Sequence, residues 1–289
     1  MDVALKRCVF PEHCSCHHGG KSFNEGQEMR EDCNTCTCKG GRWDCTNKPC
    51  YSSCSVWGDG HFTSFDGLDF DFQGVCKYVL SKGKLENGNG YSITIQNVLC
   101  GSKGVTCSKS LQINLEGDSN ETLHLSADAR GLDTVSMAPT TKMLVHKAGV
   151  FKVIEIPHLG VQIKWDRFTR VYVKLDNKWK GRVQGLCGNN NKNIKDDMST
   201  PSYGIETSVL IFGHSWKLDS SCQMPTALSD SCAENPQRKT WSQMKCGILK
   251  SSIFEKCHSE VSVDTYHKRC VYDACACDQG GDCECLCTG

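Results

Sequence analysis

The pattern of hydrophobic and polar residues changes twice along the chain. Between Cys54 and Cys222, short runs alternate apolar and polar residues with a period of two, which is typical of strands with one buried face. Seven such runs cover residues 75–80, 91–98, 111–115, 122–125, 151–156, 161–165 and 170–175. Gly and Asn clusters such as residues 86–90 separate them and indicate turns. The pattern therefore predicts an antiparallel β-sandwich, in which we expect no helix longer than a turn or two.

The two flanking stretches follow other patterns. Residues 8–50 contain eight cysteines and few aliphatic residues, so we expect cross-links to replace a hydrophobic core there. Residues 242–249, 253–257 and 263–272 are predicted as short helices, each carrying a cysteine, and nine cysteines lie in the last 58 residues. This end of the chain is predicted to be a small helical region held by disulfides.

The close spacing of Cys33, Cys36 and Cys38 is compatible with either zinc or disulfides. Zinc sites usually combine two paired clusters of Cys or His. The remaining cysteines of this stretch are spaced singly, so the sequence favours disulfides.

Composition narrows the classes of function. The 289 residues contain 33 Lys+Arg and 33 Asp+Glu, which gives no electrostatic footprint for nucleic acid or for an anionic membrane. No apolar run approaches the ~20 residues of a membrane span. The 23 cysteines indicate an oxidising compartment, so we expect a secreted, extracellular protein. Residues 1–7 lack the hydrophobic region of a signal peptide, and we expect the chain to be an internal fragment of a larger secreted protein. Asn120 begins a glycosylation sequon and is expected to carry a glycan.

Residues 185–197 (GLCGNNNKNIKDD) are rich in side-chain oxygens. Ca²⁺ binds six to eight oxygens from a flexible loop, and this run can supply many of them. A polar turn explains the same residues, because Asn, Asp and Gly dominate turns. The run is not an EF-hand loop, since Ile194 and Thr200 stand where that loop needs Gly and Glu. Without further residues, the sequence of this run favours the polar turn over a calcium-binding loop.

Several ordered motifs together resemble the von Willebrand factor type D domain. They are residues 58–67 (GDGHFTSFDG), 185–189 (GLCGN) and 212–217 (FGHSWK). Residues 33–38 with 43–45 resemble the E module, and the nine-cysteine tail resembles the C8 module. Cys8 and Cys14 look like the last cysteines of a trypsin-inhibitor-like module. The whole is most similar to the third D assembly of secreted gel-forming mucins and von Willebrand factor. We expect such a module remnant at 1–14, an E module at 15–50, a type D domain at 51–222 and a C8 module at 223–289.

The resemblance implies a calcium site. A remote carboxylate, Asp66, would join the oxygen-rich loop and complete the ligand set. The implied ligands are Asp66, Asn189, Asn191, Asp196 and Asp197, with the backbone carbonyl of Asn193. With this addition, Ca²⁺ is favoured over a polar turn.

The resemblance also implies disulfides. In the sandwich the implied pairs are Cys54–Cys187, Cys76–Cys222 and Cys100–Cys107. In the tail, we expect disulfides at Cys232, Cys246, Cys270 and Cys275. The family usually has Cys-Gly-Leu-Cys where residues 184–187 read QGLC, and the usual partner between residues 76 and 100 is also missing. No orphan thiol results, and a thiol-exchange role for that motif is in doubt.

A second departure from the family concerns self-cleavage. Some members cut themselves at Gly-Asp-Pro-His, whereas residues 58–61 read GDGH. We therefore expect no self-cleavage.

Three functions are compatible with these observations: a disulfide-linked assembly module, an extracellular protein-binding module, and a hydrolase. The hydrolase would need a nucleophile elbow, a zinc motif or a phosphate loop, and the sequence has none of these motifs. His61 and His214 stand singly beside aromatic residues, so we expect packed or hydrogen-bonded histidines and no catalytic residue. The expected partners are copies of the same chain, with other extracellular glycoproteins as further candidates.

The odd number of cysteines indicates an intermolecular bond or a reactive thiol. By resemblance, the partner of Cys257 would lie beyond Gly289, which explains part of the imbalance in the tail. Cys283 lies in a Gly-rich stretch at the position that, by the same resemblance, bridges two third D assemblies. We therefore expect a Cys283–Cys283 bond across a two-fold axis, with Cys277 and Cys285 as competing candidates.

Overall fold

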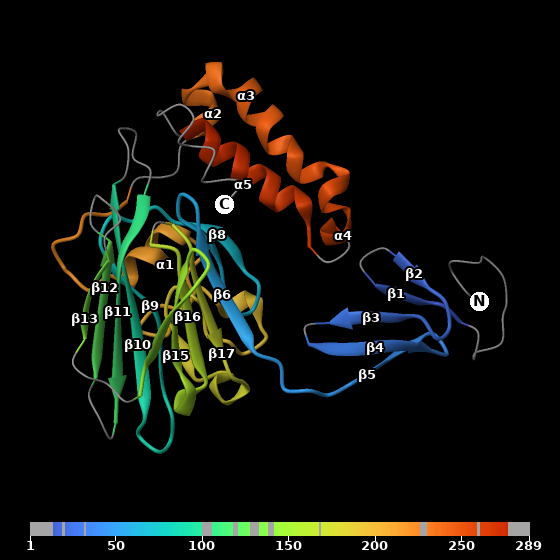
Figure 1. The fold of residues 1–289 in the computed structure, drawn as a ribbon, viewed down its shortest axis with the longest axis horizontal. Helices are drawn as coiled ribbons and strands as arrows, with labels where there is room; N and C mark the ends of the chain where they lie inside the picture. Colours follow the sequence, from blue (N-terminus) through green and yellow to red (C-terminus); the bar gives the residue numbers. More distant parts are fainter. Residues whose placement is uncertain are drawn as a thin grey trace. The chain divides into compact units, whose positions relative to one another are not determined.

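The computed structural model describes residues 14–18, 21–31, 33–99, 106–117, 121–127, 133–137, 142–167, 169–225, 230–258 and 261–276. They belong to two units, Met1–Tyr51 and Ser52–Gly289 (Figure 1). The described part is mainly antiparallel β, with a disulfide-rich N-terminal region and a small helical, disulfide-rich C-terminal region. This confirms the predicted fold class.

The first unit consists of short strands held by disulfides. A two-stranded sheet joins β1 (Cys16–His18) to β2 (Lys21–Phe23), and a three-stranded sheet has the order β3 (Glu28–Glu31), β4 (Asn34–Lys39), β5 (Arg42–Cys45). The disulfides are Cys16–Cys38, Cys33–Cys50 and Cys36–Cys45. Cys36 and Cys38 are fully buried, so their cross-links occupy the place of a hydrophobic core. All three cysteines weighed as zinc ligands are therefore in disulfides.

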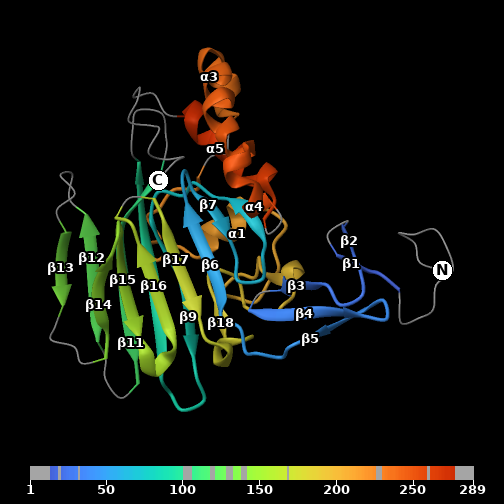
Figure 2. The same ribbon diagram turned by 45° about the vertical axis from the view of Figure 1, so that its right-hand side comes forward.

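The second unit contains the sandwich, whose described strands form two antiparallel sheets (Figure 2). One sheet has the order β13 (Asp133–Met137), β12 (Thr122–Ala127), β11 (Thr106–Glu116), β10 (Gly90–Leu99), β9 (Lys77–Lys84), β18 (Val183–Gln184). The other has the order β14 (Leu144–Ala148), β15 (Phe151–Ile156), β16 (Val161–Trp165), β17 (Val171–Leu175), β6 (Ser52–Trp57), β7 (His61–Thr63), β8 (Asp69–Asp71).

The alternating sequence produces the core between these sheets. In β16, Val161, Ile163 and Trp165 are buried while Lys164 is exposed, because successive side chains of a strand point to opposite faces. Ile93 and Ile113 of the other sheet belong to the same core cluster and are fully buried. Disulfides Cys54–Cys187 and Cys76–Cys222 reinforce this unit.

Two predicted strand features differ in the structure. The run expected at 75–80 begins at Lys77 and continues to Lys84, because β9 has hydrogen-bonded neighbours on both sides, β10 and β18. Strands β6 to β8, and likewise β13, β14 and β18, were not predicted from the pattern. β6 owes its strand conformation to β17, which lies more than a hundred positions away in the sequence.

Short helices complete the unit. Helix α1 (Val209–Ser215) begins with a cap, in which Ser208 Oγ accepts from Ile211 N, and it buries Phe212 in the sandwich core. The helical region contains α2 (Ser231–Glu234), α3 (Pro236–Cys246), η5 (Gly247–Lys250), η6 (Ser252–Phe254), α4 (Glu255–His258) and α5 (Val263–Ala276). The helix expected at 242–249 instead begins at Pro236, whose fixed φ suits a first helical position, and becomes 3₁₀ at Gly247.

Candidate functional site

The oxygen-rich loop, residues 185–197, follows directly from β18 and lies against both sheets. Cys187 N donates to Leu80 O of β9 (2.9 Å), which attaches the loop to one sheet. The Cys54–Cys187 disulfide attaches the same residue to β6 of the other sheet. The start of the loop is therefore fixed on two sides.

Asp197 is the buried carboxylate of the loop, with 1% of its surface exposed. Its Oδ2 accepts from Ser64 Oγ (2.6 Å), and its Oδ1 accepts from Asn189 N (3.3 Å). Gly188 has a φ of +78°, and a Cβ at this position would overlap Asp197 Oδ1. Glycine is thus required at position 188 by its positive φ and by the close approach of this carboxylate.

Asp66 reaches the loop from the turn between β7 and β8. Its Oδ2 accepts from Asn191 N (2.9 Å), and its Oδ1 accepts from Lys192 N (2.8 Å). Phe65 N donates to Cys187 O (3.0 Å), so the turn is also hydrogen-bonded to the loop through its backbone. The structure therefore places Asp66 with the loop although 125 positions separate it from Asn191.

Three asparagine side chains surround Asp196. Nδ2 of Asn189 donates to Oδ1 (2.9 Å), and Nδ2 of Asn191 and Asn193 donate to Oδ2 (both 3.0 Å). The hydrogen bonds from Asn189, together with those from the other two amides, lower the pKa of Asp196 below its usual range. Asp196 is therefore held in its charged form.

The electrostatics of the two other carboxylates suit a cation. Burial raises the pKa of Asp197 to about 6, and the nearby charge of Asp66 raises it further against the lowering effect of Ser64. Two carboxylates that face each other in a partly buried site repel, and a bound cation removes that repulsion. The donors of this site are carboxylate and amide oxygens, which are the ligands of Ca²⁺. The residues present therefore fit calcium.

The remaining implied ligand, the carbonyl oxygen of Asn193, also belongs to the loop. The carbonyl oxygen of Asn193 accepts from Asp196 N (3.3 Å) at the start of η4 (Ile194–Asp196), while its side chain joins the cluster. Among the other sites predicted from the sequence, Cys100, Asn120, Cys283 and the side chain of Cys107 lie outside the described residues. The four tail cysteines are joined as Cys232–Cys275 and Cys246–Cys270.

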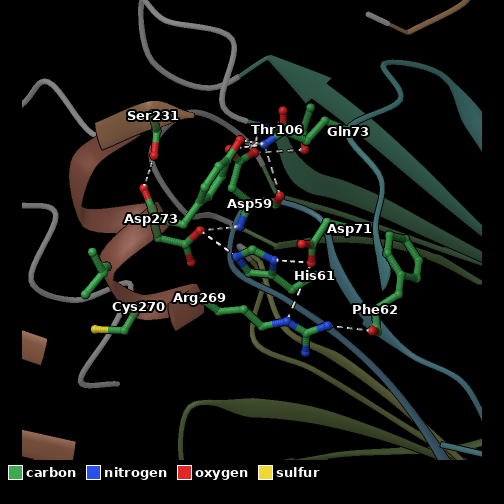
Figure 3. A network of polar contacts seen from close by, with 12 residues as sticks. Asp59, His61, Phe62, Asp71, Gln73, Thr106, Ser231, Arg269, Cys270 and Asp273 are labelled. Atoms are coloured by element: carbon green, nitrogen blue, oxygen red, sulfur yellow. Dashed lines mark hydrogen bonds and ion pairs between the residues drawn. The ribbon is translucent and has the colours of Figure 1, made fainter. Parts of the chain in front are cut away.

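A second group of polar side chains joins the sandwich to helix α5 (Figure 3). His61 of β7 is buried between two carboxylates: Nδ1 lies 2.7 Å from Asp71 Oδ1, and Nε2 lies 2.8 Å from Asp273 Oδ1. Asp71 comes from the neighbouring strand β8, and Asp273 comes from α5. His61 is thus a hydrogen-bonded histidine, as the sequence indicated.

Arg269, one turn before Asp273, makes the second contact between α5 and the sandwich. Its Nη2 donates to Phe62 O (3.0 Å), and its Nε lies 3.5 Å from Asp71 Oδ1. Its guanidinium carbon lies 5.3 Å from the centre of the Trp57 ring, within range of a cation–π interaction. On the other side, a Cβ at Gly58 would overlap Asp273 Oδ2, so only glycine fits there.

Burial changes the protonation of this group. Burial opposes the charge on His61, but hydrogen bonds to Asp273 and Asp71 outweigh it and raise its pKa to about 9. Burial raises the pKa of Asp59 to about 7, although Thr106 N donates to its Oδ1 (2.7 Å). Gln73 Nε2 also donates to Asp59 Oδ2. At neutral pH the histidine is therefore charged and compensates the carboxylates on either side.

The sequence reasoning missed Asp59, Asp71, Arg269 and Asp273. One signal was available, because Arg269 and Asp273 share a face of α5 with Cys270 and Ala274, which are buried. Charged residues on the apolar face of a helix are seldom buried without partners.

His214, the other histidine considered, lies 2.9 Å from Lys217 Nζ through its Nε2. Burial lowers its pKa, which keeps the ring neutral beside that lysine.

Comparison with known families decides the class of the chain. The profile of the von Willebrand factor type D domain matches residues 54–203, which are more than half of the chain. The chain belongs to the von Willebrand factor type D domain family. Profiles of the C8 domain and of the von Willebrand factor-like domain match residues 245–289 and 21–48. The whole oxygen-rich loop thus lies inside the type D match, whereas helix α5 lies inside the C8 match.

Relatives of this type D protein match it over nearly its whole length. Hemocytin of Bombyx mori is 45% identical over 98% of this chain, and human Mucin-5AC is 40% identical over 97%. SCO-spondin of Gallus gallus is 38% identical over 98%. The chain spans only 9%, 5% and 5% of these relatives, respectively.

Within the described ranges, every helix is too short or too polar to cross a bilayer.

Proposed function

We propose that the chain is an assembly module of a secreted, extracellular, disulfide-linked polymeric glycoprotein, and that Ca²⁺ stabilises it. One observation carries the calcium part. Asp66 reaches the loop that contains Asp196 and Asp197, and the start of this loop is fixed by Cys54–Cys187. The resemblance to gel-forming mucins and the match to Mucin-5AC support the assembly part.

The residues that would hold Ca²⁺ are those of the loop and its remote carboxylate. Asp66 and Asp197 would each supply a carboxylate oxygen, and Asp196 would supply a third. Asn189 and Asn191 carry amide oxygens beside them. The bound ion would neutralise these carboxylates and so hold the β7–β8 turn on the loop. Its role in this proposal is structural.

The covalent part of the proposal rests on cysteine pairing. An odd total of 23 leaves at least one cysteine without a partner inside the chain. We place the intermolecular bond at Cys283, with Cys277 and Cys285 as the alternatives in the same stretch. Within the described residues, Cys257 is exposed and has no disulfide partner, which makes it a further competitor.

A non-reducing gel of the chain secreted from cultured cells tests this proposal. We expect a dimer band that Cys283→Ser converts to monomer while secretion continues, and that Cys257→Ser leaves in place. If the dimer persists in Cys283→Ser, the assignment of the bond is wrong. If the wild-type chain is secreted only as a monomer and captures another extracellular protein, the alternative role of a protein-binding module replaces assembly.

A further inference from the structure

The outer face of the seven-stranded sheet carries two aromatic side chains that are partly exposed to solvent. Along β16 and β17 the inward residues are buried, and the outward residues include Lys164, Tyr172 and Lys174. The solvent face of an antiparallel sheet is normally polar. Here Tyr172 and the neighbouring Phe151 are only half-buried, so part of each ring remains accessible.

Strand register brings these side chains around one hollow. Lys164 pairs with Tyr172 across β16 and β17, and Gln162 pairs with Lys174 in the next outward row. Lys174 in turn pairs with Ser53 of β6. Together with Phe151 of β15, these side chains line a hollow of about 290 Å³. This volume is close to the lower end of the range for small-ligand pockets.

The aromatic wall of the hollow is fixed by its neighbours. The rings of Phe151 and Tyr172 meet edge to face, with centroids 5.8 Å apart and an interplanar angle of 71°. Arg170 lies over the Phe151 ring at 5.8 Å, and its Nε donates to Asp166 Oδ2 (2.7 Å). The two rings therefore contact each other, and Arg170 contacts the Phe151 ring.

The charged side chains that line the hollow are basic. No carboxylate is among the described residues that line it, while Lys164 and Lys174 are both exposed. Outside the lining, Glu155 accepts from Gln162 Nε2 (2.9 Å) and so orients the amide. A second hollow, to which Lys82, Lys84 and Arg182 contribute, also has a carboxylate, Glu116, in its lining.

We propose that this hollow binds an anionic oligosaccharide. A sugar ring presents C–H groups to aromatic surface and hydroxyls to polar side chains, and here Tyr172 with Phe151 offers the first and Gln162 with Ser53 the second. Lys164 and Lys174 would pair with a sulfate or a carboxylate on the sugar, since an ammonium binds such groups as a point charge. This site is separate from the oxygen-rich loop and does not depend on the proposed assembly role.

Titration of the full chain with three defined hexasaccharides tests the proposal. Chondroitin sulfate carries sulfate and carboxylate, hyaluronan carries carboxylate alone, and chitin hexasaccharide is neutral. Isothermal titration calorimetry should show binding of one or both anionic probes, with the neutral probe at least about tenfold weaker. The two anionic probes distinguish a sulfate from a carboxylate as the recognised group.

Variants locate the binding. Lys164→Gln with Lys174→Gln should lower the affinity by about tenfold or more, and Tyr172→Thr, which keeps strand propensity, should do the same. Lys147→Gln on the same sheet, and Lys82→Gln with Lys84→Gln in the second hollow, should change affinity by less than about twofold. The proposal is overturned if no anionic probe binds, if the neutral probe binds equally well, or if the control variants weaken binding as much as the Lys164 and Lys174 pair.

Discussion

The imidazole of His61 and the carboxylate of Asp273 lie 2.8 Å apart, although 212 positions separate them in the sequence. One residue belongs to the sandwich and the other to the C8-type helix, and both are almost completely buried. The contact therefore joins the two parts of the second unit through a charged pair that water does not reach.

We predict that His61→Ala lowers the free energy of unfolding by about 3–5 kcal/mol, because it leaves the buried carboxylate of Asp273 without its positively charged partner. Urea unfolding followed by tryptophan fluorescence measures the change. Asp264→Asn, on the same helix as Asp273, is the matched control, since it breaks an exposed ion pair with Lys250 of η5 (3.0 Å) and should cost less than about 1 kcal/mol. Equal costs for the two variants would show that the buried pair contributes nothing special.

The pKa of about 9 at His61 predicts a loss of stability at alkaline pH. A raised histidine pKa means that the folded state binds the proton more tightly, so the contribution is complete below about 6.5 and is lost as pH rises towards 9. A shift of this size corresponds to roughly 3 kcal/mol. The unfolding temperature should fall across this window, and His61→Gln should flatten the slope. A slope that persists in His61→Gln would refute the assignment.

Asp59 predicts a separate window at lower pH. Its pKa of about 7 exceeds the ordinary value, so the folded state binds the proton more tightly than the unfolded state does. Stability should therefore decline as pH rises from about 4 to 7. Asp59→Asn keeps an oxygen for Thr106 N and removes the titration. We expect the variant to be flatter than the wild type in this window alone. If the two profiles coincide, Asp59 does not titrate as described.

Calcium removal is expected to destabilise the chain, because an ion that binds only the native state stabilises it by mass action. EDTA should lower the unfolding temperature of the wild type, and Asp196→Ala with Asp197→Ala should abolish this response. Asp219→Ala changes an exposed carboxylate outside the loop and should leave the response intact. The site assignment fails if the double variant and the wild type respond equally to EDTA.

Gly188→Ala tests the packing of the loop against Asp197. Gly149 offers a matched control, because it also has a positive φ, +59°, but open space where a Cβ would be placed. We expect Gly149→Ala to cost about 1 kcal/mol from its backbone conformation alone, and Gly188→Ala to cost more and to weaken the EDTA response. Chemical denaturation with and without EDTA separates these effects. Identical behaviour of the two variants would contradict the close contact.

Much of the sandwich could be predicted from local pattern. Strands at 161–165 and 170–175 alternate clearly, and the structure has β16 and β17 there because burial of one face selects the register. The oxygen-rich loop was visible in the same way, since its ligand-type residues are neighbours in sequence. Asp66 entered only through resemblance, as nothing local connects it to the loop.

The contacts around His61 could be predicted neither from the local pattern nor from the resemblance. Their partners come from β8 and α5, and neither periodicity nor spacing indicates which distant residues meet. The hollow at Tyr172 likewise depends on the pairing of four strands, β15, β16, β17 and β6. A lone aromatic residue on a solvent face carries no such information in the sequence.

Tension applied to the chain would follow a short covalent path through the sandwich. Cys76–Cys222 joins a point near the start of the sandwich to its end, so force reaches Cys222 from Cys54 through about 22 residues. At about 3.4 Å per extended residue, this path lengthens to no more than roughly 75 Å, although 146 positions separate the two bonded cysteines. Most strands of both sheets lie outside that path, and so does the oxygen-rich loop. If the chain forms part of a polymer that flow stretches, this covalent bypass would keep the greater part of the sandwich free of load.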